Sequence, residues 1–191
     1  MAAQRPDPAT VGTTYMDIPS IAQEIRELST QSSEGHVNGV WNSILNWVFD
    51  PVNGYITRPQ DMHTRFGGRY GYSDFHTLQW RNGRRMHFLI TQCKPRSAEG
   101  QRAIWQRGAD QLQDYLRMQH RTRPVGQRTP VYGILAVGQL VRFFVYNDVH
   151  QSIEPFRPGA LFSSTQERDF YYLIHEAHLV QRALRDILNN H

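Results

Sequence analysis

Residues 74–94 read DFHTLQWRNGRRMHFLITQCK, which is the clearest β-hairpin signal in the chain. The dipeptide Asn82-Gly83 is favoured in type I′ turns, because both of its positions tolerate a positive φ. The turn predicts that a strand at 74–81 pairs with a strand at 84–94. Both faces of the second strand are largely apolar, which is typical of a central strand rather than an edge strand.

Side chains of the second strand should alternate between the two faces of the sheet. Alternation predicts Phe88, Ile90, Gln92 and Lys94 on one face, and His87, Leu89, Thr91 and Cys93 on the other. Gln92 and Lys94 then project together where the strand leaves the core. Such a polar pair is costly unless something occupies the space between its members. Cys93 points the other way and is predicted to be a small core residue.

Helices and further strands are predicted on both sides of this hairpin. The apolar period predicts a short helix from Ser20 and a four-turn helix ending at Asp50-Pro51. It also predicts a helix over 98–120 and a last helix over 166–189. Two more apolar strands, 131–137 and 141–146, meet at Gly138-Gln139. This order predicts an α/β (α+β) fold, with a central mixed β-sheet flanked by helices.

Length and composition fit one ordinary folded domain. The chain has 191 residues, of which 39% are hydrophobic. Residues 1–16 are rich in Ala, Pro, Thr and Gln, which predicts a flexible N-terminal tail before a single domain at 17–191. A single cysteine excludes an internal disulfide. Without an apolar run of membrane or signal-peptide length, we expect an intracellular protein, cytoplasmic or nuclear, with no membrane partner.

The net charge of +4 comes almost entirely from arginine, because Lys94 is the only lysine. Arginine makes bidentate contacts with phosphate, so a polyanionic partner is expected. Two groups are candidates for a nucleic-acid backbone track: Arg81, Arg84 and Arg85 at the hairpin turn, and Arg121, Arg123 and Arg128 in a later loop. The alternative is that these are solvated loop arginines.

Asp74 opens the first hairpin strand and can be brought beside Gln92 and Lys94. A carboxylate, an amide or carbonyl oxygen and two waters would hold a hard divalent ion such as Mg²⁺. Lys94 would then orient or deprotonate an attacking water, or offset charge on a scissile phosphate. The alternatives are that Asp74 belongs to a turn and that Gln92 and Lys94 are ordinary strand-end residues.

Three short motifs resemble the PD-(D/E)XK nuclease superfamily. They are Gly71-Tyr-Ser-Asp74, Ile90-Thr-Gln-Cys-Lys94 and Gln111-Leu-Gln-Asp-Tyr115. The Gln-x-Lys form is similar to Mrr-type restriction endonucleases, and Gln-x-x-x-Tyr is similar to RecB-type nucleases. Trp41-Asn42 resembles a pair in the first helix of small fungal nuclease-like proteins. The resemblance covers roughly residues 34 to 146 and implies a restriction-endonuclease-like core.

This resemblance implies a role for each matching residue. Asp74 and Gln92 would bind Mg²⁺ or Mn²⁺, and Lys94 would be the catalytic lysine. Glu34 would supply a first-helix carboxylate to the catalytic and metal site, although an acid in the first turn of a helix is also favourable by itself. Gln111 and Tyr115 lie one helical turn apart and would be accessory residues facing the site or the nucleic-acid backbone.

The leading prediction is a Mg²⁺-dependent phosphodiesterase acting on nucleic acid, DNA rather than RNA. Many nucleases of this class act as dimers, so the resemblance is compatible with a homodimer. One alternative is a catalytically silent nucleic-acid-binding module of the same fold. Another is a repurposed pocket acting on a small molecule, such as a cyclase or isomerase of secondary metabolism. This last alternative is suggested by a set of aromatic residues expected near the site: Tyr70, Tyr72, Phe75, Trp80, Trp105 and Tyr115.

Overall fold

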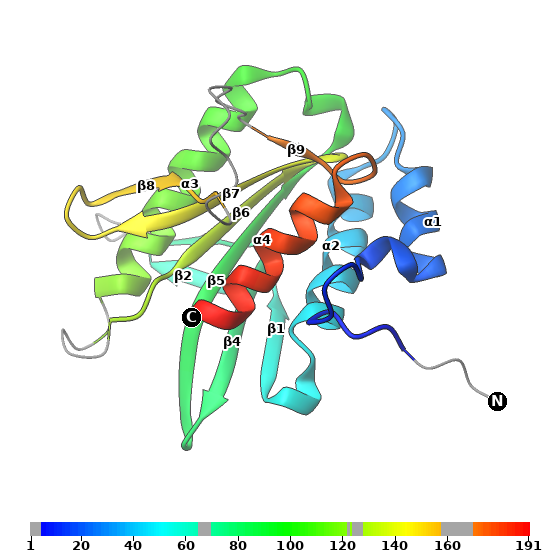
Figure 1. Cartoon of the computed structure of the whole chain (residues 1–191). Helices are drawn as coiled ribbons and strands as arrows, with labels where there is room; N and C mark the ends of the chain where they lie inside the picture. Colours follow the sequence, from blue (N-terminus) through cyan, green and yellow to red (C-terminus); the bar gives the residue numbers. More distant parts are fainter. Residues whose placement is uncertain (1–4, 65–69, 122, 124–127, 158–169) are drawn as a thin grey trace.

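A mixed seven-stranded sheet forms the centre of the computed structural model, which describes residues 5–64, 70–121, 123, 128–157 and 170–191 (Figure 1). The strand order is β1-β4-β5-β6-β7-β8, with β9 also pairing with β7. The strands are β1 (Tyr55–Pro59), β4 (Phe75–Arg81), β5 (Arg84–Lys94), β6 (Tyr132–Val137), β7 (Leu140–Asn147), β8 (Ser152–Pro155) and β9 (Tyr171–Tyr172). Strands β5 and β6 are parallel and the other pairs antiparallel, so the predicted α/β class with a mixed sheet is confirmed. Strands β2 (Met62–Thr64) and β3 (Tyr70–Tyr72) form a separate small sheet.

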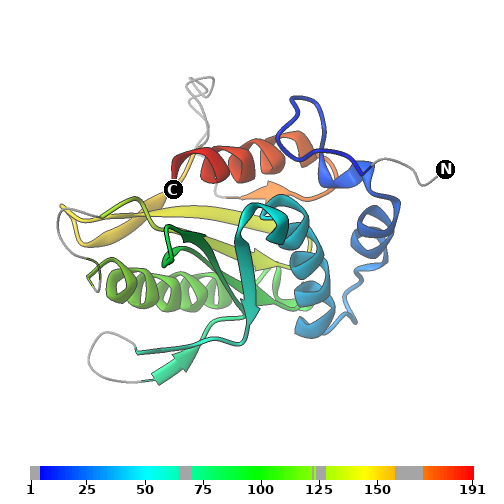
Figure 2. The ribbon, with the colours of Figure 1, turned by 90° about the horizontal axis from the view of Figure 1, so that it is seen from below.

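Helices cover both faces of the large sheet. They are α1 (Pro19–Glu27), α2 (Glu34–Val48), α3 (Arg102–Arg121) and α4 (Ala177–Asn190). Helix α3 connects the parallel strands β5 and β6, and it lies on the opposite side of the sheet from α4 (Figure 2). Two apolar cores result. One lies between α3 and one face of the sheet, and the other lies between the opposite face and helices α1, α2 and α4. In the part of the chain that the structure describes, no helix combines the length and apolar character that a membrane span requires.

The hairpin is formed as the sequence predicts. Asn82 and Gly83 have φ values of 51° and 72°, which are the positive values that a type I′ turn needs. Strand β5 pairs with β4 on one side and with β6 on the other, so it is a central strand. The predicted strands at 131–137 and 141–146 are confirmed as β6 and β7 with small shifts at their ends.

The prediction that Phe88 shares a face of the sheet with Ile90, Gln92 and Lys94 was wrong. A β-bulge interrupts the alternation of side chains along β5. Leu89 is opposite Thr77, whereas His87 is opposite Leu78, so Phe88 is an extra residue on its strand. Phe88 therefore packs in the same core as Leu89, whereas Ile90 belongs to the core under α3. Alternation resumes after the bulge and leads into the strand end that carries the candidate site.

Two predicted helices begin later than their apolar patterns indicated. Residues Arg96–Ala98 form a 3-10 turn, and α3 starts at Arg102 instead of at 98. The last helix starts at Ala177 instead of at 166, although residues 166–169 lie outside the described part of the chain. Residues 171–172 instead pair with β7 as β9, where Tyr171 packs against Phe143. The apolar pattern of the last helix continues back through residues 171–172, but these residues pair with β7 instead of joining the helix.

The N-terminal segment packs against α2 and α4 from residue 5 onward. Trp47 donates its indole N–H to the carbonyl of Pro6 (2.8 Å), and Gln181 donates its amide to the carbonyl of Pro8 (3.1 Å). Tyr15 is fully buried, and its hydroxyl donates to the carbonyl of Leu173 (2.7 Å). The composition that predicted a flexible tail over 1–16 gave no sign of these contacts.

Candidate functional site

The end of β5 borders a hollow of about 370 Å³, which we call the reaction hollow. Its lining includes every residue predicted for the catalytic and metal site, together with Gln111: Glu34, Asp74, Gln92, Lys94 and Gln111. The register of the hairpin explains the meeting of Asp74 and Gln92. Phe75 is paired with Thr91, so the next position outward on each strand brings residues 74 and 92 opposite each other.

The carboxylate of Asp74 is held by the backbone of the neighbouring strand. Its Oδ2 accepts a hydrogen bond from the Cys93 amide N–H at 2.8 Å, and its Oδ1 accepts one from Asn38 Nδ2 at 3.4 Å. Burial raises the pKa of Asp74, and the nearby Glu34 raises it further. The Cys93 N–H, the Lys94 charge and the Asn38 amide act in the opposite direction and lower that pKa. The site therefore holds a partly desolvated carboxylate in a fixed position.

Lys94 reaches the first residue of α2. Its Nζ lies 3.2 Å from Glu34 Oε2, and the two side chains are 22% and 43% exposed. Glu34 opens α2, so the N-terminus of that helix is brought to the end of β5. The only lysine of the chain is thus paired with a carboxylate inside the reaction hollow.

The side-chain amide of Gln92 has a defined orientation. Its Nε2 donates to the backbone carbonyl of Tyr72 at 3.3 Å, and the Tyr115 hydroxyl donates to the same carbonyl at 3.2 Å. Because a carbonyl oxygen can only accept, the nitrogen of the amide must face Tyr72. Gln92 Oε1 is left turned away from Tyr72, and it has no hydrogen-bond donor among the described residues.

These oxygen atoms suit a small, hard cation. Mg²⁺ in proteins is commonly held by one or two carboxylates, with waters and substrate phosphates completing its octahedron. Asp74, Glu34 and the unpaired Oε1 of Gln92 provide that type of donor set. Within the described ranges, no group of three or more His, Cys, Asp or Glu side chains is arranged to bind a metal. Any ion at this site would therefore depend on the amide oxygen and on water in addition to the two carboxylates.

The accessory residues predicted on α3 both lie near the site, but they differ in exposure. Gln111 lines the reaction hollow directly. Tyr115 is only 1% exposed and acts on the hollow through the Tyr72 carbonyl. Tyr115 therefore positions Gln92 indirectly, by holding the carbonyl that Gln92 also binds.

The hairpin arginines are separated from the reaction hollow by the length of β4. At about 3.3 Å per residue, seven strand residues place Arg81 about 20 Å from the Asp74 end. Figure 1 shows the β4–β5 turn extending to the bottom of the view, far from the end of β5. Arg81 bonds to Gln79 and to the His191 carbonyl, and Arg85 lies 5.1 Å from the Trp80 ring centroid. These arginines, with Arg84, can contact only a nucleic acid that extends well beyond the hollow.

The loop arginines each contact the protein. Arg121 donates to Gln151 at 3.1 Å, and Arg128 pairs with Asp148 at 3.1 Å. Arg123 donates to the Thr129 carbonyl and hydroxyl, and burial lowers its pKa to about 10. Residues 122 and 124–127 of this loop lie outside the described part of the chain.

Two residues of the site, Asn38 and Gln60, were not anticipated from the sequence, and Tyr72 was expected there only for its aromatic side chain. Asn38 follows Glu34 by four positions, so helical spacing could have identified it as a neighbour on the same face. Gln60 lines the hollow between strands β1 and β2, and no sequence pattern marks it. Tyr72 contributes its backbone carbonyl, which any residue would supply, so its role is invisible in the sequence.

The aromatic residues that motivated a small-molecule pocket are mostly elsewhere. Trp105 packs in the core under α3, and Trp80 is 46% exposed near the hairpin turn. Phe75 is buried beneath the opposite face of the sheet, and the side chain of Tyr70 lies outside the described part of the structure. Tyr72 does line the reaction hollow. Polar and charged groups dominate the rest of its wall, which favours an ionic substrate over an apolar one.

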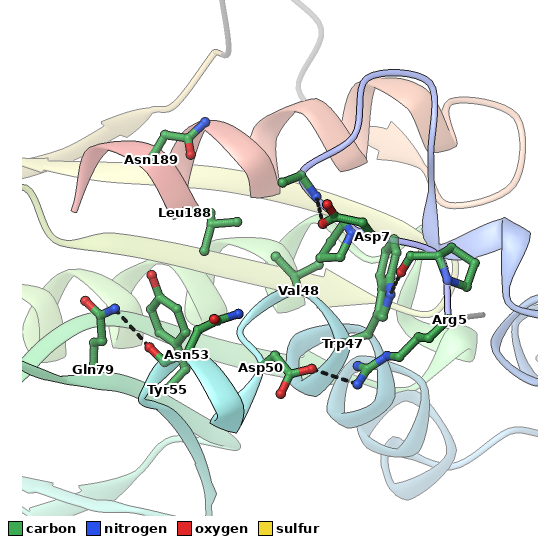
Figure 3. A pocket seen from close by; sticks show the side chains of 13 residues that line it. Arg5, Asp7, Trp47, Val48, Asp50, Asn53, Tyr55, Gln79, Leu188 and Asn189 are labelled. Atoms are coloured by element: carbon green, nitrogen blue, oxygen red, sulfur yellow. Dashed lines mark hydrogen bonds and ion pairs between the residues drawn. The ribbon is translucent and has the colours of Figure 1, made fainter.

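A second large hollow, of about 440 Å³, lies beside the N-terminal segment (Figure 3). Its principal charged groups are already paired: Arg5 contacts Asp50 at 2.7 Å, and Asp7 accepts the Ala9 N–H. Gln79 donates to the Asn53 carbonyl across its floor. Polar groups that are paired with one another give little reason to expect a ligand, so the smaller reaction hollow is the better candidate.

No protein-family model matches this chain, and no curated protein matches it at a significant level.

Proposed function

We propose that the chain is a Mg²⁺-dependent phosphodiesterase with a restriction-endonuclease-like core. Its substrate is nucleic acid, and DNA is favoured over RNA. One observation supports this most directly. Two carboxylates, an amide oxygen and the only lysine of the chain line a single hollow at the end of a central strand. Such a set offers oxygen ligands for a divalent cation and a positive charge for a phosphate in the same place.

Asp74 and Gln92 Oε1 would hold the ion, with Glu34 as a further ligand. When bound, Mg²⁺ would supply Lewis-acid activation of the phosphate and of the attacking water. Lys94 would donate a hydrogen bond to a phosphate oxygen or to the water. Because Lys94 also pairs with Glu34, a Glu34 carboxylate that turns toward the ion would free the ammonium for the substrate.

A cleavage assay with the purified protein tests this proposal. DNA and RNA are incubated with Mg²⁺ or Mn²⁺ and with wild type, Asp74→Ala or Lys94→Ala. Removing one group that stabilises charge in a transition state typically costs about 10²–10³-fold, so each substitution should lower the rate by at least about 100-fold. Glu24→Ala is a matched control, because Glu24 is an exposed carboxylate on α1 outside the hollow.

The assay also separates the alternatives. Equal cleavage by wild type and both variants would contradict the assigned site. Salt-dependent nucleic-acid binding without cleavage would instead indicate a catalytically silent binding module. A nucleic-acid substrate fits an intracellular protein of the cytoplasm or nucleus, and cutting both strands of a duplex would call for a homodimer.

A further inference from the structure

A smaller hollow of about 250 Å³ adjoins the reaction hollow, and we call it the amide hollow. Residues from α2, from the end of β1 and from the start of β4 surround it: Asn38, Gly39, Asn42, Pro59, Gln60, Asp74 and Phe75. Gln60 and Asp74 line both hollows, so the two lie on either side of these residues. A ligand whose phosphate occupies the reaction hollow can therefore extend a neighbouring group into the amide hollow.

The walls of the amide hollow are poor in charge and rich in amides. Among the described residues that line it there is no lysine or arginine and Asp74 alone is charged, so it does not suit a phosphate. Asn42 Oδ1 accepts a hydrogen bond from Asn46 at 2.9 Å, which leaves its Nδ2 as a donor without a partner in the described chain. Asn38 Oδ1 is buried and has no hydrogen-bond donor there. Because Asn38 Oδ1 is buried, the accessible donors and acceptors come from the exposed side-chain amides of Asn42 and Gln60, which suit a neutral, polar ligand.

Apolar surface completes the hollow. Pro59 and Phe75 contribute ring carbons, and a Cβ added at Gly39 would meet no atom within 4 Å, so the helix surface is open there. A volume of about 250 Å³ is smaller than the range of roughly 300–1,000 Å³ typical of drug-sized ligands, and it suits a single ring system. A flat, uncharged ring with hydrogen-bonding edges is the description of a nucleobase.

We propose that the amide hollow binds the nucleobase of the nucleotide next to the reacting phosphate. This inference rests on the proposed nuclease function and narrows its substrate class. A base can enter such a hollow only when it is out of the helical stack, so the preferred substrate is single-stranded nucleic acid or an unpaired nucleotide. Side-chain amides pair with base edges, and Asn42 and Gln60 are the candidates for that contact.

The backbone of Gln60 supports a binding role for its side chain. Gln60 has a φ of 49°, a conformation that glycine adopts more readily than any residue with a side chain. Its backbone N–H donates to the carbonyl of Asp74 at 2.9 Å, which holds it between the two hollows. Such conformations occur in turns, and they also cluster at active sites and ligand clamps, where the surrounding structure holds them in place.

Binding to small probes tests this inference without relying on cleavage. The full chain, labelled with ¹⁵N, is titrated in Mg²⁺ with deoxyadenosine 5′-monophosphate, with 2-deoxyribose 5-phosphate, which lacks the base, and with deoxyadenosine, which lacks the phosphate. Base contacts of this kind change affinity by about tenfold. The nucleotide should therefore bind about tenfold more tightly than the sugar phosphate, and it should shift the side-chain amide signals of Asn42 and Gln60.

A Gln60→Gly variant removes the side chain while easing the backbone conformation, so loss of folding is not expected. It should reduce the tenfold advantage of the nucleotide to less than about threefold. Gln151→Gly is the matched control, because Gln151 has a φ of 51° in the β7–β8 turn and does not line either hollow. This control should keep the full advantage.

These titrations distinguish a failure of the base site from a failure of the nuclease proposal. Equal affinities for the nucleotide and the sugar phosphate, or unmoved signals at residues 42 and 60, would overturn the base site and leave the nuclease proposal standing. Deoxyadenosine that shifts residues 42 and 60, while neither phosphate ligand responds to Lys94→Ala, would support the base site and overturn the nuclease proposal.

Discussion

The Lys94–Glu34 pair gives a prediction that can be measured without any substrate. Four proteins are compared in the absence of divalent ions: wild type, Glu34→Gln, Lys94→Met and the double variant. At 3.2 Å, Coulomb's law gives about 5 kcal/mol for an effective dielectric constant of 20 and about 1.3 kcal/mol for that of water. The two side chains are 22% and 43% exposed, so the value calculated for water is the more appropriate one. Measured couplings of such solvent-exposed pairs are about 0.2–1 kcal/mol.

We therefore expect a coupling energy close to 1 kcal/mol from urea unfolding, decreasing in 1 M NaCl because salt screens the attraction. Added Mg²⁺ should lower it further, since an ion bound to Glu34 would compete with Lys94. A parallel cycle with Glu24→Gln in place of Glu34→Gln should show no coupling. A Lys94–Glu34 coupling of less than about 0.2 kcal/mol, or one that salt leaves unchanged, would refute the ion pair as described.

Three further predictions concern residues around the site. The stability of Asp74→Asn relative to wild type should increase with pH: burial raises the folded-state pKa of Asp74, so wild type loses stability as pH rises from the unfolded value of about 3.9 through that raised pKa. Melting temperatures measured between pH 4 and pH 8 should therefore diverge toward high pH, and a constant difference would contradict the buried carboxylate. Tyr115→Phe should cost about 1 kcal/mol in urea unfolding by removing the hydroxyl that donates to the Tyr72 carbonyl, and an unchanged midpoint would argue against that bond. Gly138→Ala should cost about 2–5 kcal/mol, because its φ is 57° and the new Cβ would lie 2.7 Å from the Cα of Arg96; a loss of under 1 kcal/mol would show that this turn can relax.

Much of the sheet could be predicted from the sequence, since its signals act over a few residues. Asn82-Gly83 determines its own turn, because the positive φ values are a property of those two residues. The apolar run before Gln92 identifies a central strand, since both of its faces must be covered. These two local facts were enough to put Lys94 at the end of the strand and Asp74 near that end. The turn alone would pair residue 74 with residue 91, and it is the bulge at Phe88 that shifts the register by one and sets Asp74 opposite Gln92.

Longer-range contacts decided the remaining features. The bulge at Phe88 depends on how β4 and β5 pair, and no local pattern in β5 records it. Residues 171–172 join the sheet instead of the last helix, because β7 has a free edge beside them. The N-terminal segment is held by side chains more than 170 positions away, Gln181 and Arg185, which its own composition cannot reveal.

The candidate site shows the same division between local and tertiary determinants. The sequence by itself determined which residue types occupy the end of β5, because strand period and apolar content act locally. Only the tertiary structure brought Glu34 to Lys94 across 60 positions and made the Tyr72 carbonyl a shared acceptor for Gln92 and Tyr115. Contacts between distant segments depend on the packing of whole helices against the sheet, and no short-range backbone preference encodes them.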